Sequence, residues 1–364
     1  MMNSKSGKIV TFIIAGIALM VLPLLLQATG SNSWVGIVDI ALLYVLLALG
    51  LNIVVGYAGL LDLGYIAFFA VGAYLYGLLA SPHLADTFPA IKAMFPDGLH
   101  VNIWIVMIVA AVLAGIVGMI LGAPTLKLRG DYLAIITLGF GEIIRIFLLN
   151  LDRPVNITNG PKGISQIDPL TVFGFNMGQR HTLSIGDWSF TFQPVTLYYY
   201  LFLFFVILTV IISYRIQDSR IGRAWMAIRE DEIAAKAMGL NTRNLKLLAF
   251  GMGATFGGMS GVLFASFQRF VSPESFSLME SVMVVAMVVL GGIGHIPGVI
   301  LGALMLAGLP ELLRHLPDLS HMTDGRLGPE ILRQLLIALA MVVIMLIRPK
   351  GLWPSPEHGK SLAK

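Results

Sequence analysis

Cysteine is absent from this 364-residue sequence, which excludes disulfides, thiolate metal sites and thiol redox motifs. Charge is also scarce, because only 12% of the residues are Asp, Glu, Lys or Arg, against about 25% in soluble domains. The sequence contains neither a G-x-x-x-x-G-K-S/T phosphate-binding loop nor a nucleophile elbow. These absences argue against an ATP-hydrolysing enzyme, so energy for any transport must come from a partner or an ion gradient.

The chain contains long apolar runs, and hydrophobic residues make up 57% of it. A helix needs about 20 mostly apolar residues to cross a hydrocarbon layer of about 30 Å. Several runs meet this requirement, and the sequence contains ten hydrophobic segments, near residues 9–28, 34–55, 61–80, 103–122, 131–149, 197–214, 247–268, 278–293, 297–313 and 331–347. The third and eighth are rich in glycine, which is compatible with broken or re-entrant helices. The sequence therefore predicts an all-α polytopic membrane protein with about ten transmembrane helices.

Lysine and arginine positions predict how these helices are oriented, because basic residues concentrate in cytoplasmic loops. Placing the loop 215–246 in the cytoplasm puts both termini there and the loop 150–196 outside. Further basic residues then also fall inside: Lys5, Lys8, Lys127, Arg129, Arg348, Lys350, Lys360 and Lys364. This topology accounts for the net charge of +4 without a nucleic-acid partner. The predicted division is a cytoplasmic end with the first helix (1–33), a membrane domain (34–347) and a cytoplasmic tail (348–364).

The loop 215–246 is the most charged part of the chain, with seven basic and four acidic residues. Its stretch "DEIAAKAMG" is typical of a short helix, with Asp231 as N-cap and Glu232 in the first turn. Gly239 stands where a left-handed residue commonly ends a helix. The helix is expected to carry a small apolar face formed by Ala234, Ala235 and Met238. Such a face suits a groove on another protein, but spacing alone fits a solvated loop equally well.

The same stretch carries a family resemblance. "IAAKAMG" resembles the EAA loop of ABC importer permeases, whose pattern is E-A-A-x-x-x-G. Ala234, Ala235 and Gly239 match that pattern, whereas Ile233 stands at the glutamate position and the nearest acid is Glu232. The longer string "IGRAWMAIREDEIAAKAMGLN" is similar to the branched-chain amino acid ABC permeases, specifically to their LivM-type subunits.

Other stretches are similar to the same family in the same order along the chain. They are "GYAGLLDLGYIAFFAVGAYLYGLL" (56–79), "LRGDYLAIITLGFGEIIRI" (128–146), "NITNGPKGI" (156–164), "MVVLGGIGHIPGVILGA" (287–303) and "RPKGLWP" (348–354). Asp62 departs from the pattern where Ser is common, and Tyr65 departs where His is common. The resemblance covers roughly residues 36 to 354.

The resemblance implies a non-enzymatic permease subunit in a bacterial inner membrane, surrounded by lipid and without a cofactor of its own. It implies a pore formed with a LivH-type sister permease, a periplasmic amino-acid-binding protein, and two cytoplasmic ATPases that use ATP and Mg²⁺. Residues 34–347 would form the permease domain. The ATPase-coupling positions would be Asp231, Glu232, Ala234, Ala235, Met238 and Gly239. Alternatives are an importer of another small solute, such as urea, an amide or a sugar, and an ion-coupled secondary transporter.

Polar residues inside the apolar segments are the other candidates, because such residues are costly in a membrane. Glu142 lies near the middle of the fifth segment, and Arg145 follows one helical turn later, where the two can pair. The pair would either hold helices together or meet a zwitterionic amino acid. Asp39 and Asn52 in the second segment are weaker candidates for the same interior.

Four glycines in the third-segment motif have two open interpretations. Gly56, Gly59, Gly64 and Gly72 would either allow close helix packing or line a substrate path. The outer loop 150–196 mixes turn residues with a strand-like "WSFTF". It would form a lid, a receptor-docking surface or a passive cap.

Overall fold

The computed structural model describes residues 19–27, 32–125, 130–172, 174–185 and 188–314, with short stretches between 335 and 353. Five helical spans in these residues are long and apolar enough to cross a membrane: Ser33–Tyr57, Ile103–Thr125, Tyr132–Asn150, Pro194–Gln217 and Thr242–Gln268. Three shorter apolar helices are Ile66–Leu79, Leu278–Gly291 and Ile296–Pro310. The predicted polytopic, mainly helical class is confirmed. The first predicted segment is described only at 19–27, which are helical, and most of the tenth lies outside the described residues.

The helices follow the predicted order. The first half contains α2 (Asn32–Asn52), the π-helical turn η1 (Ile53–Tyr57), α3 (Ile66–Leu79), α4 (His83–Thr87), α5 (Pro89–Met94), α6 (Ile103–Thr125) and α7 (Asp131–Asn150). The second half contains α8 (Pro194–Gln217), α9 (Arg220–Glu230), α10 (Glu232–Ala237), α11 (Thr242–Gln268), α12 (Leu278–Gly291) and α13 (Ile296–Arg314). The short 3-10 turns are η2 (Gly160–Lys162) and η3 (Pro273–Phe276).

Three small antiparallel sheets accompany the helices in the part of the chain that the structure describes. They pair β1 (Ile164–Ser165) with β6 (Phe270–Val271), β2 (Thr171–Val172) with β3 (Phe175–Asn176), and β4 (His181–Ile185) with β5 (Trp188–Phe192). The β4–β5 register runs from His181 opposite Phe192 to Ile185 opposite Trp188. This hairpin includes the strand-like "WSFTF" as β5, so the strand predicted there is confirmed.

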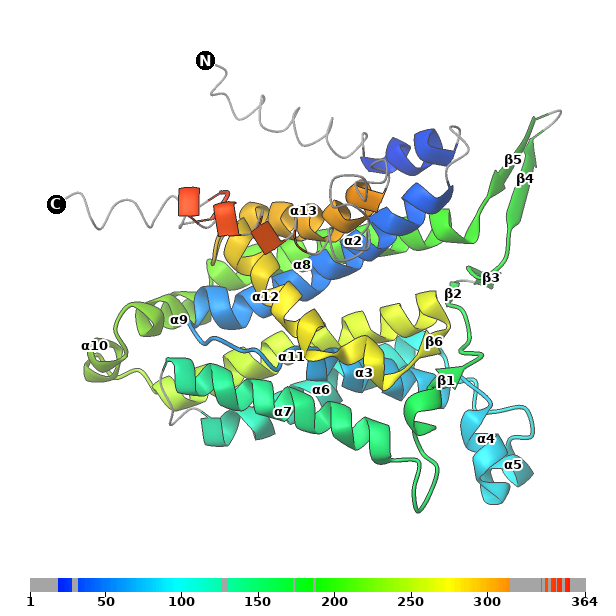
Figure 1. Ribbon diagram of the computed structural model, residues 1–364, viewed down its shortest axis with the longest axis horizontal. Helices are drawn as coiled ribbons and strands as arrows, with labels where there is room; N and C mark the ends of the chain where they lie inside the picture. Colours follow the sequence, from blue (N-terminus) through cyan, green and yellow to red (C-terminus); the bar gives the residue numbers. More distant parts are fainter. Residues whose placement is uncertain are drawn as a thin grey trace, which may run out of the picture.

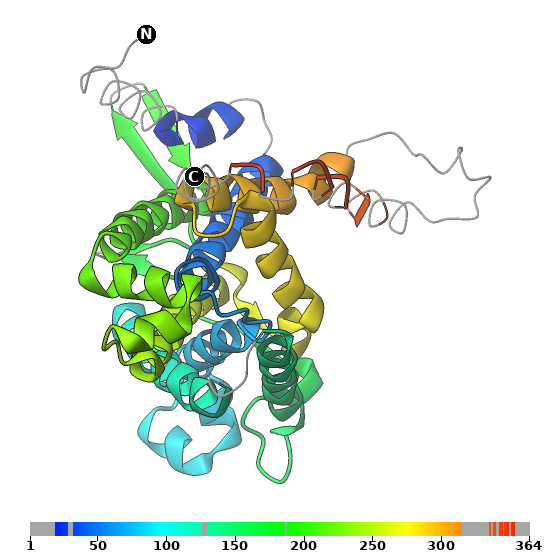
Figure 2. The ribbon, with the colours of Figure 1, turned by 90° about the vertical axis from the view of Figure 1, so that its left-hand side faces the viewer.

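The long helices lie side by side with different loops at their two ends (Figure 1). Helices α9 and α10 lie at one end, called here the α10 end. The β4–β5 hairpin and the helices α4 and α5 lie at the opposite end, called the hairpin end. Figure 2 views the bundle from the α10 end and shows α2 between α8 and α13. The loops 218–241 and 151–193 therefore lie at opposite ends, as the ten-segment prediction requires.

Helix α11 forms the centre of the packing against α3 and α6, and glycines allow the close approach. A Cβ atom on Gly72 would come within 2.8 Å of the Cα atom of Gly258 on α11. A Cβ atom on Gly118 of α6 would come within 2.6 Å of the Cβ atom of Ala254. Small residues of this kind let membrane helices pack closely, where apolar burial alone gives little driving force.

The third predicted segment is broken, as the sequence predicted. Residues 58–65 are not helical, and α3 begins only at Ile66. The freed backbone groups find partners nearby: the Leu63 N–H donates to Thr137 Oγ1 at 3.0 Å, and the Gly64 N–H donates to Asp62 Oδ1 at 2.8 Å. Buried irregular backbone is tolerated in a membrane domain when it is satisfied in this way. The eighth segment, α12, is unbroken but short, at about 21 Å by helical rise.

Helices α6 and α7 present wide apolar faces that the other described helices leave uncovered. Only 22% of the most apolar stretch of α7 is buried, compared with 67% for α11. The exposed side chains on α7 include Ile135, Ile143 and Phe147. These faces must meet lipid or another protein chain.

Candidate functional site

The short helix α10 has the two ends that the sequence predicted. Asp231 Oδ1 accepts hydrogen bonds from the backbone N–H groups of Ile233 at 2.8 Å and Ala234 at 3.0 Å. Gly239 adopts a left-handed conformation with φ of 84°. Asp231 as the N-cap and Gly239 as the terminating residue are therefore both confirmed.

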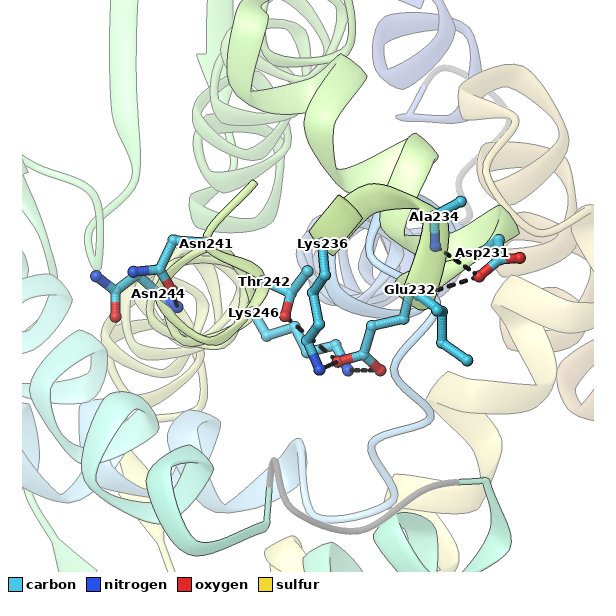
Figure 3. A network of polar contacts seen from close by, with 9 residues as sticks. Asp231, Glu232, Ala234, Lys236, Asn241, Thr242, Asn244 and Lys246 are labelled. Carbon is cyan, nitrogen blue, oxygen red and sulfur yellow. Dashed lines mark hydrogen bonds and ion pairs between the residues drawn. The ribbon is translucent and has the colours of Figure 1, made fainter. Parts of the chain in front are cut away.

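Glu232 anchors α10 to the first turns of α11 (Figure 3). Its carboxylate accepts from Lys246 Nζ at 2.7 Å and from Lys236 Nζ at 3.0 Å. Partial burial opposes ionisation, but the hydrogen bonds and charges of Lys246 and Lys236 outweigh it and lower the pKa of Glu232 to about 2. The Lys246 side chain is only 9% exposed. The pair Glu232–Lys246 thus holds α10 in a fixed position on α11.

The apolar face of α10 differs from the predicted one, and the difference is a correction. Ala235 is only 4% exposed and faces the protein, whereas Ile233 is 68% exposed and Met238 is 84% exposed. The small Ala235 side chain allows the helix backbone to approach the rest of the loop. The outward apolar surface is called here the α10 tip and consists of Ile233, Ala234, Ala237 and Met238.

Helix α9 supports α10, and sequence reasoning missed how. Ser219 caps α9 by accepting from the Gly222 N–H at 3.0 Å. Trp225 is fully buried, and its Nε1–H donates to the Leu245 carbonyl of α11 at 2.7 Å. A tryptophan in a highly charged loop was the available signal, because a large apolar side chain there requires a packing partner.

Glu142 and Arg145 on α7 form the ion pair that their spacing allows. Arg145 Nε donates to both Glu142 carboxylate oxygens at 3.0 Å, and Nη2 donates to Oε1 at 2.5 Å. The side chains of Arg145 and Glu142 remain 26% and 33% exposed. The pair therefore lies within α7 and is partly exposed. Both interpretations, a link between helices and a contact with the substrate, stay predictions.

Asp39 and Asn52 occupy different environments on α2. Asp39 is completely buried, and both carboxylate oxygens lack a hydrogen-bond partner within the described part of the chain. Asn52 Oδ1 accepts from the Gly294 N–H at 2.9 Å, which ties α2 to the turn between α12 and α13. Asn52 thus has a clear structural role.

The four motif glycines all stand at close approaches. A Cβ atom added to Gly56 would come within 2.9 Å of Gly294 Cα. A Cβ atom added to Gly59 would come within 2.7 Å of Arg229 Cγ. From position 64 it would meet the backbone of Thr137 on α7, and Gly72 packs on α11 as described above. Close packing is a sufficient reason for Gly56, Gly59, Gly64 and Gly72.

A polar cavity of about 240 Å³ opens at the hairpin end. Its lining includes His100, whose Nδ1 lies 2.5 Å from Asp168 Oδ2 and whose Nε2 lies 2.9 Å from the Asp97 carbonyl oxygen. Because both ring nitrogens face acceptors, the imidazole must be doubly protonated to satisfy them. The hydrogen bond with Asp168 raises the pKa of His100. Among the residues that the structure describes, no three His, Asp or Glu side chains gather as a metal site.

Comparisons with known proteins point in one direction. Residues 33–345 match the family described as "Branched-chain amino acid transport system / permease component". The LivM permease protein of the high-affinity branched-chain amino acid transport system of Escherichia coli (strain K12) is 41% identical over 348 residues, covering 93% of this chain and 74% of that protein. Its Salmonella typhimurium counterpart is 42% identical over 331 residues, covering 88% and 70%.

A second kind of relative is more distant. The LivH permease protein of Escherichia coli (strain K12) is 27% identical over 326 residues, covering 87% of this chain and 93% of that protein. No solved structure matches the chain significantly.

Proposed function

The chain belongs to the family of permease components of branched-chain amino acid transport systems, and from that membership we propose that it carries leucine, isoleucine and valine into the cytoplasm. It is a multi-pass membrane permease. The substrate follows from the names of its LivM relatives, which belong to high-affinity branched-chain amino acid systems. The work is transport, and the energy comes from ATP hydrolysed on other subunits.

The ATP-driven step rests on one observation, which is the form of α10. Its outer surface is apolar, with Ile233 and Met238 more than two thirds exposed. Its other side is fixed by the Asp231 cap and the Glu232–Lys246 pair. A rigid helix with an exposed apolar tip suits a groove on a partner protein. We infer that each transport cycle begins with an ATPase pushing on this tip.

The partners follow from the same reasoning. Two ATPases would dock on the cytoplasmic side, one on α10 of this chain and one on the equivalent helix of a LivH-type sister permease. A periplasmic amino-acid-binding protein would deliver the substrate to the hairpin end. The outer loop 150–196, with its projecting hairpin, would form part of that docking surface.

The substrate path is proposed along the uncovered face of α7. A charged pair that is partly exposed on a membrane helix is costly against lipid. Glu142 and Arg145 would instead face the sister permease across a polar passage. There the pair would offer a carboxylate and a guanidinium to a zwitterionic amino acid. Asp39 remains a second polar position for the same path.

Topology reporters test the orientation in the membrane. A reporter fused at Lys162 is expected outside, and one fused at Lys364 is expected in the cytoplasm. Both reporters on one side would mean that one of the ten segments does not cross.

Co-purification tests the ATP-driven assignment. The chain is expressed with its sister permease and the two ATPases, and a tag on this chain is used for purification. The ATPases should elute with the parent chain in near-stoichiometric amounts. Recovery of the chain without them, from membranes that contain all four proteins, would support an ion-coupled transporter instead.

A further inference from the structure

The guanidinium of Arg229 joins the cytoplasmic loop to the break in the third membrane segment. Arg229 lies near the end of α9, three residues before α10 begins. Its Nη1 donates to the carbonyl oxygen of Gly56 at 2.5 Å, across 173 positions of sequence. Gly56 belongs to η1, after which the chain leaves the helix. Carbonyls at a helix end lack regular helical partners, and an arginine satisfies them well.

Three glycines form a socket for the Arg229 side chain. Gly56 supplies the acceptor, and a Cβ atom on Gly59 would lie 2.7 Å from Arg229 Cγ. A Cβ atom on Gly294 would lie 2.9 Å from Arg229 Nη1. Gly59 and Gly294 also have positive φ values of 69° and 83°. The arginine therefore fits because Gly59 and Gly294 carry no side chain, whereas a Cβ atom on Gly56 would meet Asn52 and Gly294.

Family-like stretches that lie far apart in the sequence come together around the socket. Asn52 Oδ1 accepts from the Gly294 N–H, which joins α2 to the α12–α13 turn. The Leu352 N–H of the "RPKGLWP" stretch donates to the Leu290 carbonyl at 2.8 Å. His295 Nδ1 lies 2.9 Å from the Trp353 carbonyl oxygen. The stretch 348–354 thus packs on the stretch 287–303, which in turn meets the stretch 56–79 beside Arg229.

From the socket, contacts continue to the helix that bears the charged pair. The non-helical residues after η1 include Leu63, whose N–H donates to Thr137 Oγ1 on α7 at 3.0 Å. The Ser281 hydroxyl of α12 donates to the Leu63 carbonyl. Gly64 packs directly against the backbone of Thr137, and Glu142 follows on the same helix. A movement of η1 would therefore be transmitted to α7 and α12 through these buried contacts.

We propose that Arg229 is a positioning residue that transmits movement of α10 to the broken segment of residues 56–65, and from there to α7. The proposal rests on the proposed function, because it requires an ATPase to move α10. Trp225 and Lys246 hold the loop on α11, whereas Arg229 holds it on η1 and the α12–α13 turn. The loop thus spans two parts of the membrane domain, and pushing its tip shifts one relative to the other.

The absence of cysteine from this chain allows a direct test by a reversible disulfide. A Cβ atom at position 59 would lie 3.1 Å from the Cβ atom of Arg229, close to the roughly 3.5–4.5 Å of a disulfide. The variant Arg229→Cys removes the hydrogen bond, and Gly59→Cys with Arg229→Cys replaces it by a covalent link. Each is assembled with the sister permease and ATPases in lipid vesicles, and leucine uptake and ATP hydrolysis are measured together.

Arg229→Cys should reach the membrane and bind the ATPases, yet take up about tenfold less leucine per ATP, as the loss of a charged hydrogen bond suggests. In the double variant, oxidation should restore the leucine taken up per ATP to the parent value, and a reductant should lower it again. Arg223→Cys is the matched control, because Arg223 lies on α9 and its side chain, among the hydrogen bonds described, donates only to the nearby Asp218 carbonyl. Its ratio should equal that of the parent.

Two results would overturn the proposal. One is that Arg229→Cys takes up as much leucine per ATP as the parent. The other is a parallel loss of uptake and hydrolysis that oxidation does not restore, since that indicates a merely structural role. If the cysteine variants fail to fold, Arg229→Lys replaces them, with an expected drop of about threefold in leucine per ATP; an unchanged ratio refutes the proposal. Failure of the proposed function is distinguishable, because the parent complex itself would then show no ATP-dependent leucine uptake.

Discussion

The two ends of the molecule use their residues in opposite ways. At the α10 end, charged and aromatic side chains fix a short helix in place through Trp225, Arg229 and Glu232. At the hairpin end, β4 and β5 are joined mainly by backbone pairing and project from the bundle (Figure 1). A two-stranded hairpin alone is only marginally stable. The α10 end is therefore held by contacts between distant segments, as the proposed coupling role requires, whereas the hairpin end projects, as the proposed docking role requires.

The largest expected effect comes from removing the anchor of the α10 end. Trp225→Ala empties a fully buried site and should destabilise the loop by about 3–5 kcal/mol. Membrane abundance and resistance of the loop 215–246 to protease should both fall sharply. The matched control at the other end is Phe175→Ala, because Phe175 is 61% exposed. If both variants lose membrane abundance and protease resistance equally, the α10 end is not held more firmly than the hairpin end.

The next effect separates docking from folding within α10. Met238→Glu places a charge on the exposed α10 tip and should reduce co-purified ATPase about tenfold or more, with normal abundance of the permease. Ala235→Glu forces a charge into a buried position and should lower abundance as well as transport. If Met238→Glu retains the ATPases and transports at the parent rate, the α10 tip is not the docking surface.

A double-mutant cycle tests the charged pair on α7. Either Glu142→Gln or Arg145→Gln alone leaves one unpaired charge in the membrane, at a cost of about 2.5–3.5 kcal/mol. The double variant should recover abundance because no lone charge remains. Leucine uptake should stay low if the pair lines the substrate path, as we propose. Recovery of both abundance and uptake would assign the pair a purely structural role.

The smallest expected effect concerns pH at the hairpin end. The raised pKa of His100 means that its contact with Asp168 is complete below the ordinary histidine pKa and is lost as pH rises through the folded-state value. Because the His100 side chain is 45% exposed, the contact is worth at most about 1 kcal/mol. Protease cleavage of the loop 95–102 should increase modestly from about pH 6 to about pH 9. His100→Gln should remove this dependence; a persistent dependence would point to another group.

Local signals in the sequence predicted the ends of α10 well. The Asp231 cap and the left-handed Gly239 depend on interactions within a few residues, so residue type and spacing are sufficient. The order of the long helices was also predictable, because each apolar run carries its own signal. The break before α3 was indicated by its glycines.

Contacts between distant segments were not predictable from the sequence. Whether Ala235 faces the solvent or the protein depends on how α10 packs on the rest of the loop. The Arg229–Gly56 contact spans 173 positions, and the Asn52–Gly294 contact spans 242. The exposure of the Glu142–Arg145 pair depends on which face of α7 the other helices leave uncovered. Tertiary packing decides all of these, and a single sequence does not specify it by local rules.

The energy source of leucine uptake distinguishes an ATP-driven permease from an ion-coupled transporter, and it can be measured in lipid vesicles that contain this chain, its sister permease and the ATPases. Transport is measured with the amino-acid-binding protein on the hairpin side, and with either ATP on the α10 side or a proton or sodium gradient. We expect leucine uptake that requires ATP, needs no gradient, and is lost with Met238→Glu. Uptake driven by a gradient without ATP, and unaffected by Met238→Glu, would contradict it.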